Sequence, residues 1–509
     1  MAKTLNDGSQ VRLGVVLSYV LIFLNAVYGL FLTPFIIGQV GEAAYGVYKT
    51  VSAFTASMMV LDLGMGGTMM RYISRYRADN EEEKIPNFIC MGLIQTGVLC
   101  VLVGVVTLVL YFFLDVIYQN GLTAAELENA KTLYIFLALG IVAHMFENFL
   151  NGIISGYNRF VFANGIKLIR LLARIALIVL FLSIFKNTLV LVAVDLICTL
   201  FFVLAELAFL SLRLKVKIKY TRWEGDVFKE SFRYTILMFL SSLVAQANSN
   251  IPNVLIGALI NSTAVTIYSM AVLIFGMFEQ LSTAISGVML PTVTETLKND
   301  DENLTNTKSV VIKAGRVQFL LLGAVLMGFL TLGRHFIELW LGSGYEDVYF
   351  LVMILLGPAL LELCINVCLS ILRAKNIIGF RTAVIVLSSV LNLAISVILM
   401  KYIGYYAAAI GTACSFLFGS VITMGIYFYK VLKINILHLY KNIFSGIWIC
   451  IVLGACAAAL AVYLIDSVVW SFVLGFIGFV VVYAATLLLF GLNKDEKNII
   501  LKRFRRKKA

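Results

Sequence analysis

Long runs of mainly apolar residues set the strongest limit on how this chain can fold. About fourteen such runs are long enough for a helix to cross the roughly 30 Å hydrocarbon core of a bilayer. Hydrophobic residues make up 61% of the chain and charged residues only 13%, against about half and about a quarter in soluble domains. We therefore predict an all-α polytopic membrane protein with about 14 transmembrane helices. The predicted spans are residues 13–37, 45–70, 88–112, 132–155, 160–184, 188–212, 233–257, 264–290, 315–340, 348–372, 378–400, 406–430, 443–465 and 468–491.

The distribution of lysine and arginine predicts the orientation in the membrane. If both termini are cytoplasmic, five of the 40 basic residues lie near the outer face and three lie within a span. All the others then fall in cytoplasmic loops and ends, as the positive-inside rule requires. We therefore predict a multi-pass protein of the cytoplasmic (inner) membrane with both termini in the cytoplasm. The net charge of +12 belongs mainly to these inner segments, which can contact anionic lipid headgroups, so it indicates no nucleic-acid partner.

Cysteine and histidine give no sign of a disulfide framework, a metal site or a cofactor. All eight cysteines fall within the predicted spans or at their edges, and we interpret them as small apolar residues. The three histidines, His144, His335 and His438, are far apart in the chain. The predicted outer loops are short, the longest being about 113–131, so we expect no enzymatic domain and no catalytic residues.

Three basic residues lie inside the predicted span 160–184. At roughly 100° per residue, the spacings of Lys167, Arg170 and Arg174 place them on one stripe of the helix. A charge at the centre of a spanning helix costs about 2.5–3.5 kcal/mol on insertion scales, so such residues usually face a wet cavity and mark a pathway. A cationic stripe suggests an anionic cargo. The alternative is snorkelling to the headgroups, which Lys167, about 10 Å along the helix, could achieve more easily than Arg174, about 21 Å along it.

Other polar residues within the spans are candidates to contact sugar hydroxyls or a coupling ion. The first half supplies His144, Glu147, Asn148, Asn151 and Asp195, and the second half Gln246, Asn250 and Glu279. The alternative in each case is ordinary interhelical packing. Glu147, Asp195 and Glu206 are also candidates to pair with the basic stripe, because a buried cation left unpaired is costly.

The sequence also indicates an internal duplication. Short patterns recur about 220 residues apart, as in Pro34 and Pro252, Tyr48 and Tyr268, and Asn158 and Asn376. Six predicted spans separate equivalent points, and an even number makes the repeats parallel, related by an axis along the membrane normal. We predict an N-lobe at 1–212, a cytoplasmic linker at 213–232, a C-lobe at 233–432, and two added helices with a basic cytoplasmic tail at 433–509.

Two stretches near the N-terminus resemble a known family. Gly41-Glu-Ala-Ala-Tyr-Gly precedes the second span, and Asp62-Leu-Gly is followed by Arg71-Tyr at the end of that span. This pattern resembles the N-terminal signature of bacterial polysaccharide flippases, in the multidrug/oligosaccharidyl-lipid/polysaccharide exporter (MOP) superfamily. The likeness extends to the chain length, the span number, the repeat of six and six spans, and the two trailing helices.

The resemblance implies a flippase for an undecaprenyl-pyrophosphate-linked oligosaccharide, moved from the inner to the outer leaflet by alternating access for cell-surface polysaccharide synthesis. Lys167, Arg170 and Arg174 would then bind the pyrophosphate. The implied partners are the lipid-linked substrate and membrane lipids, with the protein a monomer, alone or beside other polysaccharide-assembly proteins. Alternatives are a lipid II flippase or a drug/cation antiporter, although the basic stripe has the wrong sign for a cationic cargo. A non-transporting component or enzyme of polysaccharide assembly is a hypothesis of a different class.

Overall fold

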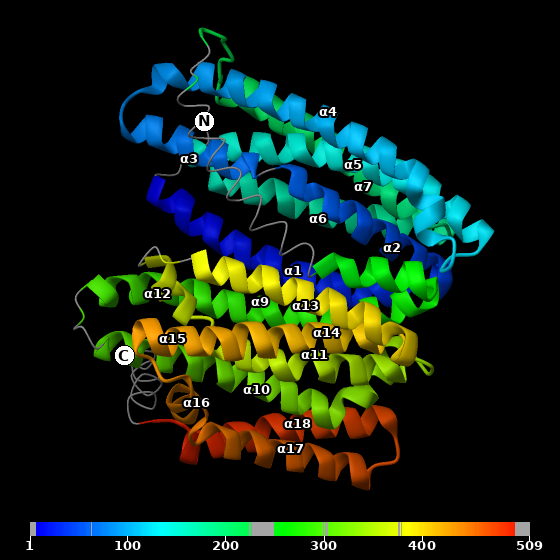
Figure 1. Ribbon diagram of the computed structural model, residues 1–509, viewed down its shortest axis with the longest axis vertical. Helices are drawn as coiled ribbons and strands as arrows, with labels where there is room; N and C mark the ends of the chain where they lie inside the picture. The colour runs from blue at the N-terminus through cyan, green and yellow to red at the C-terminus, as the bar shows by residue number, and fades with distance from the viewer. Residues whose placement is uncertain are drawn as a thin grey trace. The chain divides into compact units, whose positions relative to one another are not determined.

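The protein is built from helices throughout the part that its structure describes. A computed structural model describes residues 7–62, 64–222, 225, 249–298, 300, 304–374, 377 and 379–493, and every regular element in these ranges is helical (Figure 1). Twelve helices in the described ranges are long and apolar enough to cross a membrane. The predicted class, an all-α polytopic membrane protein, is confirmed, and the predicted number of about fourteen spans is approximate.

The chain packs into two compact units, unit 1 (Met1–Ser269) and unit 2 (Met270–Ala509). The predicted division into lobes around a linker at 213–232 stays a prediction, because residues 226–248 lie outside the described residues. The predicted span 233–257 falls largely in the same gap. Unit 1 contains α1 (Asp7–Val40), α2 (Glu42–Met58), α3 (Met65–Ala78), α4 (Ile85–Tyr118), α5 (Ala124–Gly156), α6 (Phe160–Phe185) and α7 (Leu189–Ala208), then helical residues 249–259 and the start of α9 (Ser262–Lys298).

The predicted span 45–70 is not one continuous helix. α2 ends at Met58, a 3-10 turn follows at Met59–Asp62, and α3 begins at Met65. Gly64, just before α3, has a φ of 69° in the left-handed region. That conformation costs roughly 1–2 kcal/mol for residues with a Cβ and little for glycine. Hydropathy alone treats this stretch as uniform, so the prediction of a single helix was wrong at this break.

The predicted outer loop 113–131 is mostly helical. α4 continues to Tyr118 and α5 begins at Ala124, which leaves only a short turn between them. Thr123 and Glu126 form a reciprocal capping box at the start of α5, and this cap begins the helix earlier than hydropathy suggests. The Ser262 hydroxyl donates a hydrogen bond to Glu126, which ties the first residues of α9 to unit 1.

One end of unit 1 gathers the starts of several helices. The starts of α1 and α6 meet there, and Asn164 Nδ2 donates to the Gly14 carbonyl at 2.9 Å. The segment after α7 reaches the start of α4, where the Lys219 amide donates to the Pro86 carbonyl at 3.3 Å. The connection between α3 and α4 lies at this end as well (Figure 1).

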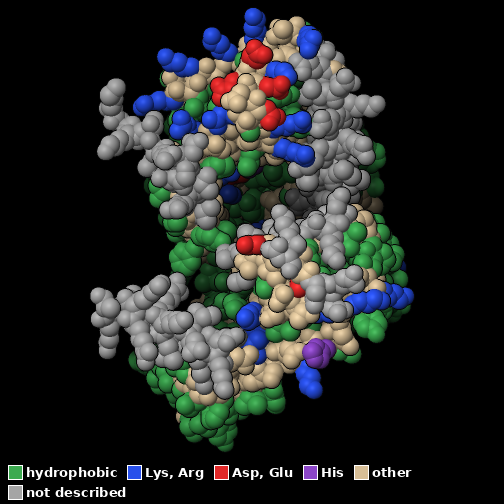
Figure 2. All heavy atoms as spheres, turned by 90° about the vertical axis from the view of Figure 1, so that its left-hand side faces the viewer, with side chains coloured by type: hydrophobic (Ala, Val, Ile, Leu, Met, Phe, Trp, Pro, Cys, Tyr) green, Lys and Arg blue, Asp and Glu red, His purple; other side chains and the backbone are tan. Residues whose placement is uncertain are grey.

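This end of unit 1 is rich in charge. Figure 2 shows basic and acidic side chains gathered over it. Ion pairs join Arg75 to Asp79 (3.7 Å), Arg77 to Glu82 (3.6 Å) and Lys84 to Glu81 (2.7 Å). The predicted topology requires charged connections at one end. It remains a prediction that this end faces the cytoplasm.

Unit 2 contains the rest of α9 and a further set of helices. They are α10 (Thr305–Leu341), α11 (Glu346–Ile365), α12 (Cys368–Ala374), α13 (Gly379–Ile403), α14 (Tyr406–Ser415), α15 (Met424–Leu432), α16 (Ile436–Phe444), α17 (Ile447–Leu464) and α18 (Val468–Thr486). π-Helical turns continue α14 at Phe416–Thr423 and α18 at Leu487–Gly491.

The last two helices form a hairpin that packs against α10 (Figure 1). Leu332 of α10 is buried in one apolar cluster with Ala455 and Ala458 of α17 and Phe479 of α18. The Tyr483 hydroxyl donates to the Leu320 carbonyl at 2.8 Å. The hairpin is therefore held to α10 by apolar contact and by hydrogen bonding.

A buried arginine fastens one end of this hairpin. Arg316 of α10 is only 3% exposed, and its guanidinium donates to the carbonyls of Asn442 (3.2 Å), Ser445 (2.9 Å) and Gly491 (3.0 Å). These carbonyls lie where α16 and the turn after α18 end, and carbonyls in a last helical turn lack intrahelical donors. Arg316 thus supplies donors that two helix ends need.

We expect Arg316→Ala to lower the unfolding free energy by about 3 kcal/mol or more, because it removes charge-assisted hydrogen bonds and leaves buried carbonyls unsatisfied. Thermal unfolding in detergent measures this loss, and limited proteolysis around 433–446 should become faster. Lys430→Ala, at an exposed lysine of α15, is the control. Equal unfolding temperatures for the two variants would contradict the anchoring role.

Candidate functional site

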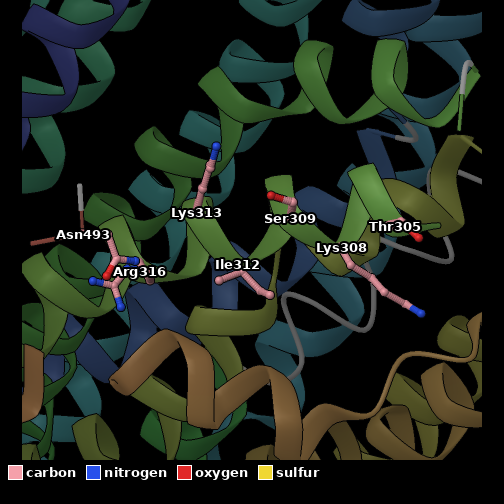
Figure 3. A pocket seen from close by; sticks show the side chains of 7 residues that line it. All are labelled: Thr305, Lys308, Ser309, Ile312, Lys313, Arg316 and Asn493. Carbon is pink, nitrogen blue, oxygen red and sulfur yellow. The ribbon is translucent and has the colours of Figure 1, made fainter. Parts of the chain in front are cut away.

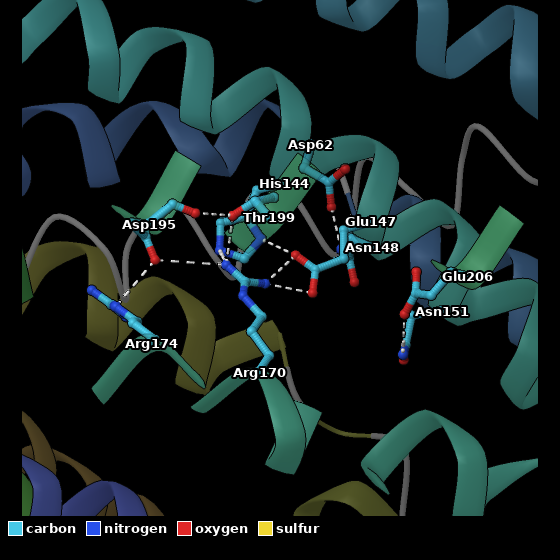
Figure 4. A network of polar contacts seen from close by, with 10 residues as sticks. All are labelled: Asp62, His144, Glu147, Asn148, Asn151, Arg170, Arg174, Asp195, Thr199 and Glu206. Carbon is cyan, nitrogen blue, oxygen red and sulfur yellow. Dashed lines mark hydrogen bonds and ion pairs between the residues drawn. The ribbon is translucent and has the colours of Figure 1, made fainter. Parts of the chain in front are cut away.

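The predicted basic stripe lies on α6, which begins and ends within one residue of the predicted span. Arg170 and Arg174 extend toward side chains of α5 and α7 (Figure 4). Their side chains are 12% and 27% exposed and pair with carboxylates of neighbouring helices, which disfavours snorkelling to the headgroups. Lys167 is exposed and forms no ion pair within the described part of the chain. Snorkelling therefore remains an interpretation for Lys167 alone.

Arg170 is the centre of a polar network inside unit 1. Its Nη1 donates to both carboxylate oxygens of Glu147 on α5, and its Nη2 donates to Thr199 Oγ1 on α7 at 2.7 Å. Nη2 also lies 3.5 Å from His144 Nε2, while His144 Nδ1 lies 2.8 Å from Glu147 Oε2. Glu147 is buried. One guanidinium therefore joins three helices, using the planar fork of five donors that arginine offers.

Arg174 pairs with Asp195 of α7, one helical turn further along. Arg174 Nε lies 3.2 Å from Asp195 Oδ1, and Arg170 Nη2 lies 3.7 Å from the same oxygen. The Arg174 guanidinium is also 5.9 Å from the ring centre of Tyr28 on α1. Two guanidinium groups thus face two carboxylates, and their formal charges cancel. The pairing that sequence suggested for Glu147 and Asp195 is present in the structure.

Two further carboxylates lie beside this network, each held by an asparagine of α5 (Figure 4). Asn148 Nδ2 donates to Asp62 Oδ2 at 2.6 Å, and Asn151 Nδ2 donates to Glu206 Oε1 at 3.3 Å. The other oxygens, Asp62 Oδ1 and Glu206 Oε2, are buried and accept no hydrogen bond from the described residues. Glu206 therefore takes an amide partner in place of the basic stripe.

Asp62 is the member of this group that sequence reasoning missed as a site residue. The signal was present, because Asp62 belongs to the Asp62-Leu-Gly motif, but nothing in the sequence placed it beside α5. The close approach of α3 to α5 explains the contact. A Cβ at Gly66 would lie 2.6 Å from the Asn148 carbonyl oxygen, so only glycine allows the helices to lie this close.

The other predicted candidates lie elsewhere. Asn250 is in the helical residues 249–259 of unit 1, and Glu279 is on α9 in unit 2. Gln246 lies outside the described residues. These three residues stay candidates for sugar or ion contacts. Within the described ranges, no group of three or more His, Cys, Asp or Glu residues is arranged to hold a metal ion, and all eight cysteines are free.

Solved structures of transporters share this fold. The structure titled "Lipid II flippase MurJ, inward closed conformation" matches with a TM-score of 0.72 at 15% identity, covering 93% of this chain and 98% of that one. An inward-facing multidrug resistance MATE family transporter of the MOP superfamily matches with a TM-score of 0.61 at 15% identity, covering 80% of this chain and 95% of that one. The chain is thus a multi-pass membrane protein with the fold of these transporters.

The sequence itself identifies the family. Residues 13–297 match the family described as "Polysaccharide biosynthesis protein". The chain belongs to this family. A curated relative, "Probable low-salt glycan biosynthesis flippase Agl15" of Haloferax volcanii, is 26% identical over 192 residues, a match that spans 38% of this chain and 40% of the relative. The predicted family membership is confirmed.

We expect Glu147→Gln to lower the unfolding free energy by about 3 kcal/mol, because Arg170 loses its nearest counter-charge and keeps only the longer contact with Asp195. Arg170→Met should cost less than Glu147→Gln, because Glu147 keeps its contact with His144 Nδ1. The double variant should cost clearly less than the sum, since it buries neither charge. The unfolding free energies of the intact protein, the two single variants and the double variant, measured in detergent, form a double-mutant cycle that gives the coupling energy of the pair.

The exposed pair of Arg75 and Asp79 provides a matched control for this cycle. Arg75 is 58% exposed in its side chain, and exposed pairs contribute about 0–1 kcal/mol. Arg75→Met should therefore change the unfolding free energy little. Strict additivity of the Glu147 and Arg170 substitutions would show that their ion pair does not stabilise unit 1.

Proposed function

We propose that this protein is a flippase that moves an undecaprenyl-pyrophosphate-linked oligosaccharide from the inner to the outer leaflet of the cytoplasmic membrane, for cell-surface polysaccharide synthesis. Family membership supports a role in polysaccharide biosynthesis. The single observation that carries the cargo class is the cationic stripe, with Arg170 and Arg174 partly buried inside unit 1. Guanidinium groups bind phosphate oxygens with paired hydrogen bonds, which suits a pyrophosphate headgroup.

Binding of such a cargo proceeds by exchange of partners. Arg170 and Arg174 are already paired with Glu147 and Asp195, so the phosphate groups must replace these carboxylates. Glu147 also lies 2.8 Å from His144 Nδ1, and this contact gives the carboxylate a partner after Arg170 turns to phosphate. The pairs thus keep the cations compensated in the empty state, and Glu147 keeps a partner when Arg170 turns to an anion.

Lys167 is the first contact in this scheme. It is exposed, and it lies two helical turns before Arg174, nearer the start of α6. With the predicted orientation, that start faces the cytoplasm, where the lipid-linked cargo is made. A headgroup entering from the inner leaflet meets Lys167 before the two arginines. The two units then alternate access, and an inside-negative potential favours outward movement by about 2.3 kcal/mol per negative charge per 100 mV.

The charges also separate this proposal from a drug/cation antiporter. Along the basic stripe a cationic cargo finds no carboxylate free of an arginine partner, because Glu147 and Asp195 both contact arginine. Lipid II also carries a pyrophosphate, so the same residues would serve a lipid II flippase. The two kinds of flippase differ in the sugar part of their cargo. The test therefore compares a lipid-linked oligosaccharide with lipid II.

In reconstituted vesicles, we expect Lys167→Gln to slow flipping of a labelled lipid-linked oligosaccharide by about fivefold, because one exposed charge is lost without disturbing an ion pair. The double variant Glu147→Gln with Arg170→Met should slow it about tenfold or more, because the central cation is gone. Reagent access to the label at the outer leaflet measures the rate.

The double variant separates transport from folding, because it removes both charges of the pair and leaves neither of them without its partner. Lys430→Gln, an exposed lysine of α15, is the control and should flip at the rate of the unchanged protein. Parallel vesicles carry lipid II or a lipophilic cationic dye in place of the oligosaccharide. If the double variant flips the oligosaccharide at the rate of the unchanged protein, Arg170 does not bind the phosphate. Transport of the dye but of neither lipid would favour the antiporter.

A further inference from the structure

A second basic site lies in unit 2, away from the network around Arg170. A cavity of about 370 Å³ opens beside the first turns of α10. Its lining residues are Thr305, Lys308, Ser309, Ile312, Lys313, Arg316 and Asn493 (Figure 3). Three are basic, three more are neutral with hydrogen-bond donors, and no carboxylate is among the described residues that line it. Such a lining suits an anion.

The length of α10 places this pocket at the membrane surface. α10 has 37 residues, which at 1.5 Å per residue is about 55 Å and exceeds the roughly 30 Å hydrocarbon core. Residues 317–333 of the helix carry no charge, whereas the pocket occupies 305–316, which includes Lys308, Lys313 and Arg316. The uncharged stretch fits the hydrocarbon, so the pocket lies at the level of the headgroups, on the side predicted to be cytoplasmic.

The walls of the pocket are fixed by contacts already present. Buried Arg316 holds the end of α16 and the turn that precedes Asn493. Asp300 accepts hydrogen bonds from the amides of Asn306 (3.1 Å) and Thr307 (2.6 Å) in the first turn of α10. Because Asp300 occupies these amides, an anion in the pocket is bound by side chains rather than by the helix terminus.

The two lysines flank the floor of the pocket. Figure 3 shows Lys308 and Lys313 extending to either side of a strip that contains Ser309 and Ile312. Lys308 is half-buried and Lys313 is exposed. A headgroup seated on this strip has a cation on each side, a hydroxyl beside it and an apolar surface for the start of its acyl chains. Lysine serves well here, since it binds phosphate as a flexible point charge.

We propose that this pocket binds the phosphate group of an anionic phospholipid from the surrounding leaflet. Basic pockets between helices at the cytoplasmic surface are where such headgroups are recognised. The proposal does not depend on the transported cargo, because it concerns unit 2 alone. A lipid held at this position contacts α10 beside the end of the α17–α18 hairpin, so it is bound at the junction that Arg316 fastens.

The test compares lipid binding by the intact chain and by Lys308→Gln with Lys313→Gln, in detergent, by native mass spectrometry. The probes are dioctanoyl phosphatidylglycerol and the zwitterionic dioctanoyl phosphatidylcholine. The intact chain should prefer the anionic lipid, and the double variant should lose about fivefold in affinity for it per lysine removed. Arg316 is left unchanged because its loss would disturb the fold.

Two control variants keep the result interpretable. Lys430→Gln with Lys433→Gln removes the same charge from exposed lysines of unit 2 that do not line the pocket, and it should retain the preference. Lys308→Arg with Lys313→Arg keeps the charge and should retain it as well. Equal losses in the two Gln double variants, or no loss in either, would overturn the proposal. Saturable binding of inorganic phosphate that needs Lys308 and Lys313, without a lipid preference, would assign the pocket to a free phosphate and overturn the lipid assignment.

Discussion

The ion pair between Arg170 and Glu147 is the interaction on which unit 1 depends. A spanning helix with two partly buried arginines is unstable unless its neighbours provide carboxylates at the same depth. α5 provides Glu147 and α7 provides Asp195, so these pairs set the register of α5, α6 and α7 against one another. Apolar side chains alone would tolerate several registers, since lipid and protein interior are similarly apolar. The charges that look costly in the sequence therefore specify how the three helices pack.

Arg170 and Arg316 show two ways of keeping an arginine inside a membrane protein. Arg170 is compensated by carboxylates, which can rotate away, take another partner or bind a proton. Arg316 is compensated by backbone carbonyls at helix ends, which do none of these. The first arrangement can exchange partners and suits a site that binds and releases a cargo. The second is permanent and suits the attachment of α16 and the α17–α18 hairpin to α10.

Sequence predicts the features that depend on local periodicity and on the cost of isolated charge. It places α6 to within one residue, finds the stripe, and identifies Glu147 and Asp195 as partners for it. It does not find the break between α2 and α3, because one glycine with positive φ leaves the hydropathy of the stretch unchanged. Nor does it find Asp62, whose contact with Asn148 depends on how closely α3 and α5 approach. Depth and spacing along one helix are local properties, whereas contact between helices is not.

The break between α2 and α3 has a consequence for the meaning of Asp62 and Asn148. Where a chain leaves the helix at membrane depth, its freed backbone N–H and C=O groups need hydrogen-bond partners, which lipid does not offer. Asp62, the buried last residue of the 3-10 turn, accepts a hydrogen bond from exposed Asn148 of α5, so a polar contact lies at the point where the helix is interrupted. This contact joins α5 to the chain at the interruption between α2 and α3, which apolar side chains could not do by a directed hydrogen bond.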